Sequence, residues 1–450
     1  MLKNRADQLT AFVVVAALFG GGGVAYGLSN LVIQLAALAL LALHYPAVRQ
    51  FVAKAPRPLI ALLLATLLLP LLQLAPLPPA IWTAMPGREM VHEALVAAGG
   101  EGWFATTVNS ARTFVAFLGL LAPFTVIVLG WRSPDNAVGR MTLTFIVLGV
   151  ANVLLGAVQL LGPGQFGVLY VENDMSGVMF GLFANRNSTG IFLDCCLILL
   201  ATLPPTRLAS TGGLAKMTAA VLLVLGVILT QSRTSVVLLL VPLVFAAIRQ
   251  ISSRFERSGS SGANAASAPR LALGSLIALA ALSAILVPLT GGSRIDSVLA
   301  RFEQKQEQRP MIWEDARYSV SRYWPVGAGM ATFDEVFQAD ESLEYVSQRR
   351  AGRAHNDYLE IAIEAGAFGL ALVAAWALWA FVSAWQAIAA PQRWPALGGF
   401  AILLTIGLQS VLDYPLRNQT MLCLAGLAVL LLAPVASRGT RRSVDAENMQ

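Results

Sequence analysis

Long runs of apolar residues recur from one end of the chain to the other, separated by polar stretches that carry most of the charges. The runs reach roughly 17–22 residues, the length that an α-helix needs to cross a hydrocarbon layer of about 30 Å. The predicted spans lie near residues 11–28, 30–45, 58–76, 113–130, 141–162, 187–204, 216–231, 235–249, 271–290, 361–386, 396–412 and 418–435. The pattern therefore predicts an all-α polytopic membrane protein with about twelve transmembrane helices.

Composition supports a membrane protein. Hydrophobic residues make up 56% of the chain and charged residues only 12%, whereas a soluble domain carries about 25% charged residues. The three cysteines lie inside apolar runs without metal-ligand spacing, so we expect them to be small core side chains. The net charge of +6 comes mostly from loops between the apolar runs, which indicates membrane topology and no nucleic-acid partner.

The basic residues of the loops set the orientation. With Lys3 and Arg5 of the N-terminus in the cytoplasm, the loops that fall inside are the ones rich in basic residues. These residues are Arg49, Lys54, Arg57, Arg132, Arg140, Arg207, Lys216, Arg249, Arg254, Arg257 and Arg270, with Arg438, Arg441 and Arg442 in the tail. We therefore expect both termini in the cytoplasm and an uncleaved first span.

The same pattern divides the chain into four parts. Residues 1–290 are expected to form an N-terminal membrane bundle of about nine spans, and residues 361–435 about three further spans. Residues 436–450 form a basic cytoplasmic tail. Residues 291–360 form the largest outer loop, with an amphipathic helix predicted over 309–324 and then a turn at PVGAGM. We expect this loop to cap the membrane domain as a small, partly helical lid.

Two other connections differ in composition from the rest. Residues 258–269 read SGSSGANAASAP, which is typical of a flexible cytoplasmic linker with nothing to bury. Residues 77–112 form an outer loop whose PLPPAIWTAMPG segment, with Trp82, resembles chain that lies at the membrane interface.

Two arginines are predicted at the outer ends of spans, against the inside bias of basic residues. Arg186 lies beside Asn187 in FANRNSTG, and Arg233 lies in TQSRTS between the seventh and eighth spans. An arginine within the membrane costs roughly 2.5–3.5 kcal/mol on insertion scales, so each either anchors a helix end by snorkelling or serves a function. The pair favours function, because two guanidinium groups suit a diphosphate held at the outer leaflet.

The large loop adds more basic residues, which either extend this positive field or form a solvated charged face. They are Arg309, Arg349, Arg350 and Arg353.

A histidine follows in GRAHNDYLEIAIEAGAFG, residues 352–369. Asn356 suits the N-cap of a helix that begins at Asp357, so His355 is predicted just outside the first turn, at the membrane surface. Histidine has the side chain whose ordinary pKa lies nearest neutral pH, so it suits removal of a proton from a hydroxyl; the alternative is a residue that only caps the turn. Asp413, in SVLDYPLRN, either orients an acceptor or pairs with Arg417.

Other chemistries lack their motifs. The chain has no H-E-x-x-H, G-x-S-x-G or Walker A sequence, and three histidines without a carboxylate cluster predict neither a metal site nor a cofactor. A transporter or flippase of lipid-linked sugars is the alternative, although the spans hold few mid-membrane ionisable residues and no repeated pair of broken helices. A structural scaffold would leave Arg186, Arg233 and His355 without a role.

FANRNSTG, QSRTS, the RPMIW…PVGAG segment and AHNDYLEIAIEAGAFG occur in this order, each predicted on the outer side. In these motifs the chain resembles the O-antigen ligase and O-antigen polymerase superfamily of bacterial inner membranes, most clearly over residues 180–370. The resemblance implies a periplasm-facing glycosyltransferase that moves a glycan from undecaprenyl pyrophosphate to a sugar hydroxyl, without a metal. Attack opposite the leaving pyrophosphate would invert the anomeric carbon.

The resemblance also implies roles for single residues. Arg186 and Arg233 match pyrophosphate-binding arginines, Arg309 matches the basic residue that opens the large loop, and His355 matches the essential histidine, a candidate base. The acceptor is either a lipid A core sugar, for a ligase, or a second lipid-linked repeat unit, for a polymerase of O-antigen or exopolysaccharide. The SVLDYPLR ending leans toward a polymerase by analogy alone, and the sequence does not separate the two.

Overall fold

The computed structural model describes residues 4–23, 25–100, 102–134, 136–162, 169–170, 177–206, 210–258, 309–344, 350–390 and 393–447. These residues are mostly helical, as the apolar pattern predicted. Within them, one small sheet pairs β1 (Pro76–Leu77) with β2 (Phe104–Ala105) in antiparallel fashion. The predicted span 271–290, nearly all of the predicted linker, residues 291–308 and Arg349 lie outside the described residues.

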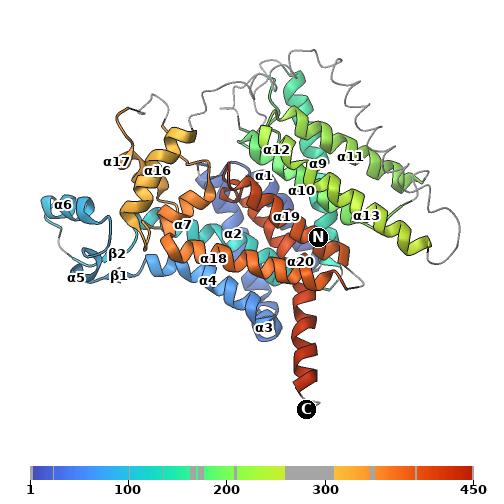
Figure 1. The fold of residues 1–450 in the computed structure, drawn as a ribbon, viewed down its shortest axis with the longest axis horizontal. Helices are drawn as coiled ribbons and strands as arrows, with labels where there is room; N and C mark the ends of the chain where they lie inside the picture. The colour runs from blue at the N-terminus through green and yellow to red at the C-terminus, as the bar shows by residue number, and fades with distance from the viewer. Residues whose placement is uncertain are drawn as a thin grey trace.

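Every predicted span within the described residues overlaps a helix or a consecutive pair of helices (Figure 1). The helices are α1 (Arg5–Phe19), α2 (Gly27–Leu43), α3 (Tyr45–Lys54), α4 (Arg57–Gln73), α5 (Pro79–Trp82), α6 (Glu89–Ala97), α7 (Ser110–Gly119), α8 (Leu121–Gly130), α9 (Ala137–Leu161), α10 (Arg186–Thr202), α11 (Thr211–Leu229), α12 (Arg233–Leu238), α13 (Leu240–Ser258), α16 (Arg309–Tyr323), α17 (Phe333–Asp340), α18 (Asp357–Ala387), α19 (Arg393–Gln409) and α20 (Gln419–Glu447), with a 3-10 turn η1 (Pro415–Arg417) before α20.

Within the described part of the chain, six helical segments are long and apolar enough to cross a membrane. They are Arg57–Leu74, Ser110–Gly130, Ala137–Leu161, Thr211–Leu229, Arg233–Ser253 and Asp357–Ala387. A seventh results if α2 and α3, bent by 78° to each other, form one span. The helices α1, α10 and α19, of 15 to 17 residues, are shorter. The structure therefore supports a helical membrane protein, and the number of twelve spans stays a prediction.

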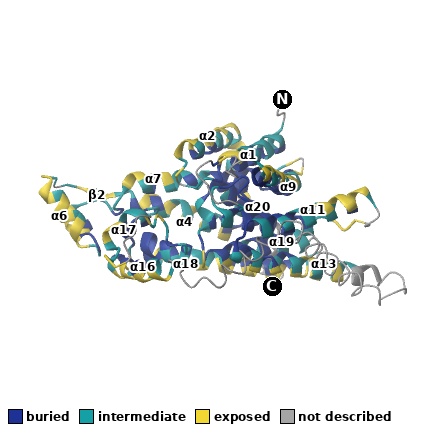
Figure 2. Cartoon of the chain, turned by 90° about the horizontal axis from the view of Figure 1, so that it is seen from above, coloured by how far each residue is buried: buried dark blue, intermediate teal, exposed yellow. Residues whose placement is uncertain are grey.

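α10 lies inside the bundle, where it packs against α9, α11, α13 and α19. Figure 2 shows the buried residues concentrated in this middle part, around α19 and α20. α20 in turn packs against α8, α18 and α19. The three cysteines are free and buried, as expected for small core side chains. The N-terminal ends of α10 and α20 are therefore held by a rigid apolar core.

The helix predicted over 309–324 is α16, and it packs with α17 on the first turns of α18. A second hydrophobic cluster joins these three helices, separate from the core of the bundle; it includes Ala316, Tyr323, Phe333, Phe337 and Ile363. We call α16, α17 and the turn between them the outer unit. It occupies the described part of the loop for which a lid was predicted.

α18 is interrupted at Gly366, which has φ 56° and ψ −143°. The N–H of Ala367 donates to the carbonyl of Pro325 at 2.9 Å, so a turn of the outer unit inserts at the break. A Cβ at position 366 would lie 2.0 Å from that carbonyl oxygen, which only glycine avoids. The break separates the first turns of α18, which carry the polar residues described below, from the apolar remainder.

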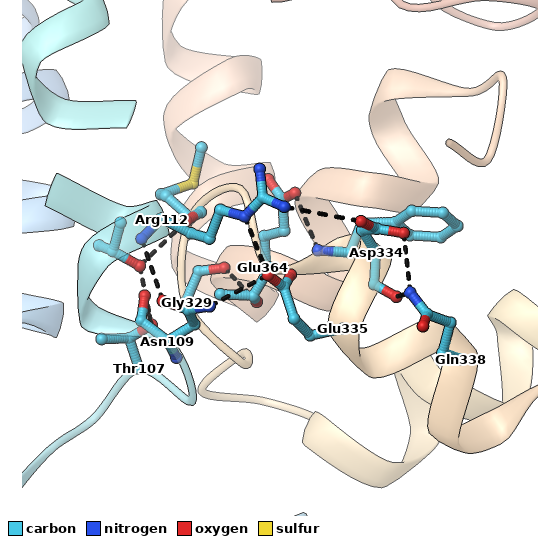
Figure 3. A network of polar contacts seen from close by, with 12 residues as sticks. Thr107, Asn109, Arg112, Gly329, Asp334, Glu335, Gln338 and Glu364 are labelled. Atoms are coloured by element: carbon cyan, nitrogen blue, oxygen red, sulfur yellow. Dashed lines mark hydrogen bonds and ion pairs between the residues drawn. The ribbon is translucent and has the colours of Figure 1, made fainter. Parts of the chain in front are cut away.

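Polar contacts attach α17 to the beginning of α7 (Figure 3). Oε1 of Glu335 accepts from Nδ2 of Asn109 at 3.0 Å and from Nε of Arg112 at 2.9 Å. Asp334 lies 3.7 Å from Nη2 of Arg112 and accepts from Nε of Arg350 at 2.7 Å. Arg350, one of the four basic residues predicted to add to an anion field, is therefore paired with an acid of the outer unit.

The segment between α4 and α7 folds into a small unit of its own around Trp82. The Trp82 side chain is only 3% exposed and packs against Phe104 and His92, with ring centroids 5.2 and 5.7 Å away. The residue that the sequence placed in an interfacial segment thus lies inside this unit. Arg88, 1% exposed, attaches the unit to the outer one by donating to the carbonyl of Gly327 at 2.8 Å.

Candidate functional site

His355 immediately precedes α18, where the sequence predicted it. Oδ1 of Asn356 accepts from the N–H of Leu359 at 3.0 Å, which confirms Asn356 as the N-cap of a helix that begins at Asp357. Nδ1 of His355 lies 3.1 Å from Oδ1 of Asp413, and the two side chains are 34% and 2% exposed. Where the Asp413 carboxylate accepts a hydrogen bond from Nδ1, Nε2 of the neutral imidazole keeps its lone pair.

Asp413 has a partner that the sequence did not indicate. Arg417, the alternative partner, points instead toward three carboxylates of α18: it donates to Asp357 at 3.1 Å and to Glu364 at 2.9 Å, and it forms an ion pair with Glu360 at 3.1 Å. Burial by itself would lower the pKa of Arg417. The negative charges of the three carboxylates outweigh burial and hold the pKa well above its ordinary value. Asp413 therefore contacts His355, and Arg417 is held by the acids of α18.

Arg186 is the first residue of α10, and its neighbour Asn185 contacts the His355–Asp413 pair. Oδ1 of Asn185 accepts from the N–H of Asn187 at 2.8 Å and so caps the helix. Nδ2 of the same Asn185 side chain reaches Oδ2 of Asp413 at 3.5 Å. Within the described residues, Nη1 of Arg186 is buried and has no hydrogen-bond partner. Such a donor is costly to leave unsatisfied, so it suits a bound acceptor.

Arg233 and Arg309 also open helices. Ser232 caps α12, which begins at Arg233, and Oγ of Ser235 lies 3.5 Å from the carbonyl of Asn187 in α10. Arg309 begins α16, close enough for its positive charge to act on Arg233. The three arginines therefore lie at helix N-termini, whose partial positive charge adds to theirs.

The remaining predicted residues act through the backbone or through acids. Asn187 contacts Asn185 through its backbone N–H and Ser235 through its backbone carbonyl. Arg353 donates to Oε2 of Glu360 at 3.0 Å, and its guanidinium lies 5.9 Å from the centre of the Tyr414 ring. The Tyr414 ring is also 5.0 Å from the imidazole of His355. Arg353 therefore lies beside the histidine, but it is already paired.

Sequence reasoning missed Asn185, Trp313 and Glu360, which hold the predicted residues in place. Trp313 donates from Nε1 to the carbonyl of Ala354 at 2.8 Å, and Oε1 of Glu360 accepts from the N–H of the same Ala354 at 2.9 Å. A signal was present for the acids, because positions 357, 360 and 364 share one face of a helix. No comparable signal linked Trp313 to residue 354, since that contact is formed only in the folded chain.

A family model described as O-antigen ligase matches residues 218–374. This range contains Arg233, Arg309 and His355, whereas Arg186 and Asp413 lie outside it. No curated protein matches the chain. Within the described residues, no group of three or more His, Cys, Asp or Glu side chains is placed to hold a metal ion. Three of the four ordered motifs lie within the matched range, and over residues 218–374 the chain is similar to the O-antigen ligase family.

Proposed function

We propose that the protein is an inverting glycosyltransferase that moves a glycan from undecaprenyl pyrophosphate to a sugar hydroxyl on the periplasmic side of the bacterial inner membrane. The acceptor is a lipid A core sugar or a second lipid-linked repeat unit. The observation that carries the proposal is the link from the His355–Asp413 pair through Asn185 to Arg186. This link supports a base and an anion-binding group in one site, which is what this transfer requires.

The arginines suit the donor pyrophosphate. A phosphate oxygen would satisfy the buried Nη1 of Arg186, which has no partner among the described residues. Arg233 and Arg309 each begin a helix, and two guanidinium groups suit the two phosphates of a diphosphate. Helix N-termini bind phosphate groups through their free N–H groups and dipole, and α10 and α16 both begin at one of these arginines.

The reaction follows from this arrangement. The acceptor hydroxyl oxygen attacks the anomeric carbon and forms the new glycosidic bond, while its proton passes to Nε2 of His355. The bond from the anomeric carbon to the pyrophosphate oxygen breaks, and its electron pair leaves with undecaprenyl pyrophosphate. Asp413 stabilises the imidazolium, and the arginines stabilise the charge on the leaving group. Proton transfer of this kind contributes typically 10²–10⁴-fold to the rate.

The outer unit suits the role of a lid. It packs on the first turns of α18, and Trp313 of α16 reaches the residue next to His355. A cover of this kind holds the acceptor and limits the access of water, which would otherwise compete as the nucleophile. The basic inner loops orient both termini to the cytoplasm, so this unit and the site would face the periplasm.

A deletion strain tests the proposal through the lengths of its lipid-linked and surface glycans. Long chains on the lipid carrier with bare lipid A core at the surface would identify a ligase, and loss of long polymer from every pool would identify a polymerase. Repeat units trapped on the cytoplasmic face would overturn the enzyme and favour a flippase.

Complementation of this strain tests the site. We expect His355→Ala and Arg233→Ala to insert normally and to restore no transfer, whereas His92→Ala, at an exposed position in the unit around Trp82, restores it fully. Full activity of an inserted His355→Ala protein would exclude His355 as the base.

A further inference from the structure

The backbone immediately before His355 is fixed on both sides. Ala354 is fully buried; its N–H donates to Oε1 of Glu360 at 2.9 Å, and its carbonyl accepts from Nε1 of Trp313 at 2.8 Å. His355 itself has a φ of +50°, which a non-glycine residue adopts at some cost and keeps only when its surroundings enforce it. The conformation of His355 therefore depends on groups that do not touch its ring.

Glu360 makes most of these contacts. Its side chain is fully buried, and besides the Ala354 N–H it accepts from Nη1 of Arg353 at 3.0 Å and forms an ion pair with Nη2 of Arg417 at 3.1 Å. One backbone N–H and two guanidinium groups converge on these two oxygens, and only a carboxylate offers both the acceptor positions and the negative charge that suit them. Glu360 thus connects the residues on the N-terminal side of His355 to the segment that follows Asp413.

We infer that Glu360 is a positioning residue for His355, an inference that rests on the proposed function of this site. Glu360 acts through Ala354 and Arg353, not on the reacting atoms: it holds the chain in the one conformation that presents Nδ1 of His355 to Asp413. Trp313, in the outer unit, also helps to fix this conformation, because its indole N–H donates to the carbonyl of Ala354. A glycosyl acceptor then meets an imidazole whose orientation is set before the acceptor binds.

Glutamine at position 360 changes this contact in a defined way. It has one acceptor and one donor in place of two acceptors, so its NH₂ group faces either the Ala354 N–H or the two guanidinium groups. Either orientation places donors against donors and displaces the residues before His355. For Glu360→Gln we expect kcat to fall about 10- to 100-fold while KM for the lipid-linked donor stays within about twofold.

Glu364 provides the matched control. It is one turn further along α18, is also fully buried, and accepts from Nη1 of the same Arg417 at 2.9 Å. Its other side-chain contact is with the N–H of Phe333 at 3.4 Å, on the outer unit. Glu364→Gln removes an equivalent charge from the same cluster without changing a contact of residues 353–355. We expect it to lower thermal stability about as much as Glu360→Gln, with kcat within about threefold of the unchanged protein.

The modification rate of His355 by diethyl pyrocarbonate gives a measurement that needs no glycosyl transfer. The full chain in detergent is treated, and each histidine is followed by mass spectrometry, with His44 and His92 as internal references. We expect Glu360→Gln to change the rate at His355 at least about threefold and to leave His92 unchanged. Glu364→Gln should change neither.

Equal rates and equal kcat in the two glutamine variants would overturn the inference. If Glu360→Gln cannot be purified folded, Trp313→Phe removes only the indole N–H from the other side of Ala354; a changed rate at His355 supports the inference and an unchanged rate overturns it. A protein that transfers no glycan even before mutation would overturn the proposed function instead, and the modification rates would still decide whether Glu360 holds His355.

Discussion

Replacement of Asp413 by asparagine keeps the shape of the side chain. It favours a different tautomer of His355, with the ring hydrogen on Nε2 in place of Nδ1. Oδ1 of Asp413 accepts from Nδ1 of His355 at 3.1 Å, and Oδ2 lies 3.5 Å from Nδ2 of Asn185. Asparagine has one acceptor for these two donors. If its oxygen faces Asn185, its NH₂ group faces Nδ1, and His355 must carry its hydrogen on Nε2, where the proposed reaction needs a lone pair.

The structure sets the size of the effect. To react, His355 of the variant must return to the tautomer with hydrogen on Nδ1, against the NH₂ group of the introduced asparagine or with loss of the Asn185 contact. Asp413 is only 1% exposed, so water does not replace the lost acceptor. A hydrogen bond to a charged group contributes about 1.5–3 kcal/mol, which corresponds to a fall in kcat of about 10- to 150-fold at 1.36 kcal/mol for each factor of ten.

Single-turnover transfer from a synthetic polyprenyl-pyrophosphate glycan, with the chain in nanodiscs, measures this fall. Asp315→Asn is the control, because Asp315 of α16 is also a buried acid but accepts from the N–H of Ser342, just after α17, at 3.1 Å. In a His355→Ala background, Asp413→Asn should have no further effect. Losses that multiply in the double variant, or an unchanged rate in the single one, would refute an action of Asp413 through His355.

Three further substitutions test other contacts. Arg186→Ala should raise KM for the lipid-linked donor at least about tenfold, since it removes a buried charged donor; a donor titration measures this, and an unchanged KM would contradict it. Gly366→Ala should lower the apparent melting temperature, because a side chain at φ 56° with a carbonyl oxygen 2.0 Å away adds strain of about 1–3 kcal/mol; fluorescence-detected unfolding is the check, and an unshifted transition counts against it. Arg88→Met leaves the buried carbonyls that Arg88 contacts unpaired, at a cost of about 1–3 kcal/mol each. Limited proteolysis should therefore cut residues 79–106 faster than in the unchanged protein. Equal cutting rates would exclude a role of Arg88 in attaching the unit around Trp82 to the outer unit.

Local sequence predicted the parts of the fold that depend on local physics. Apolar length predicted helices because a run of this kind must satisfy its own backbone inside a membrane. Asn356 was identified as an N-cap because its side chain bonds to the N–H of Leu359, three residues away. The extent of α16 followed in the same way from a helical pattern of apolar residues.

The partners of the site residues could not be predicted in this way. Asp413 is 58 positions from His355, and its neighbour Tyr414 is the residue whose ring faces the imidazole. Arg417 was the obvious partner by spacing, but three carboxylates of α18 already surround it. Which acid an arginine meets is set by helix packing, and a single sequence contains no measure of that.

The contacts also explain why four short motifs must occur together. Each motif supplies one end of a contact whose other end lies in a different segment: Asn185 bonds to Asp413 across 228 positions, Trp313 to Ala354 across 41, and Ser235 to Asn187 across 48. In the proposed reaction, an arginine at a helix N-terminus binds the donor pyrophosphate, and transfer also requires a base close to the bound donor. Because Asn185 caps the helix of Arg186 with one end of its amide and contacts Asp413 with the other, the proposed donor site and the proposed base share a single side chain.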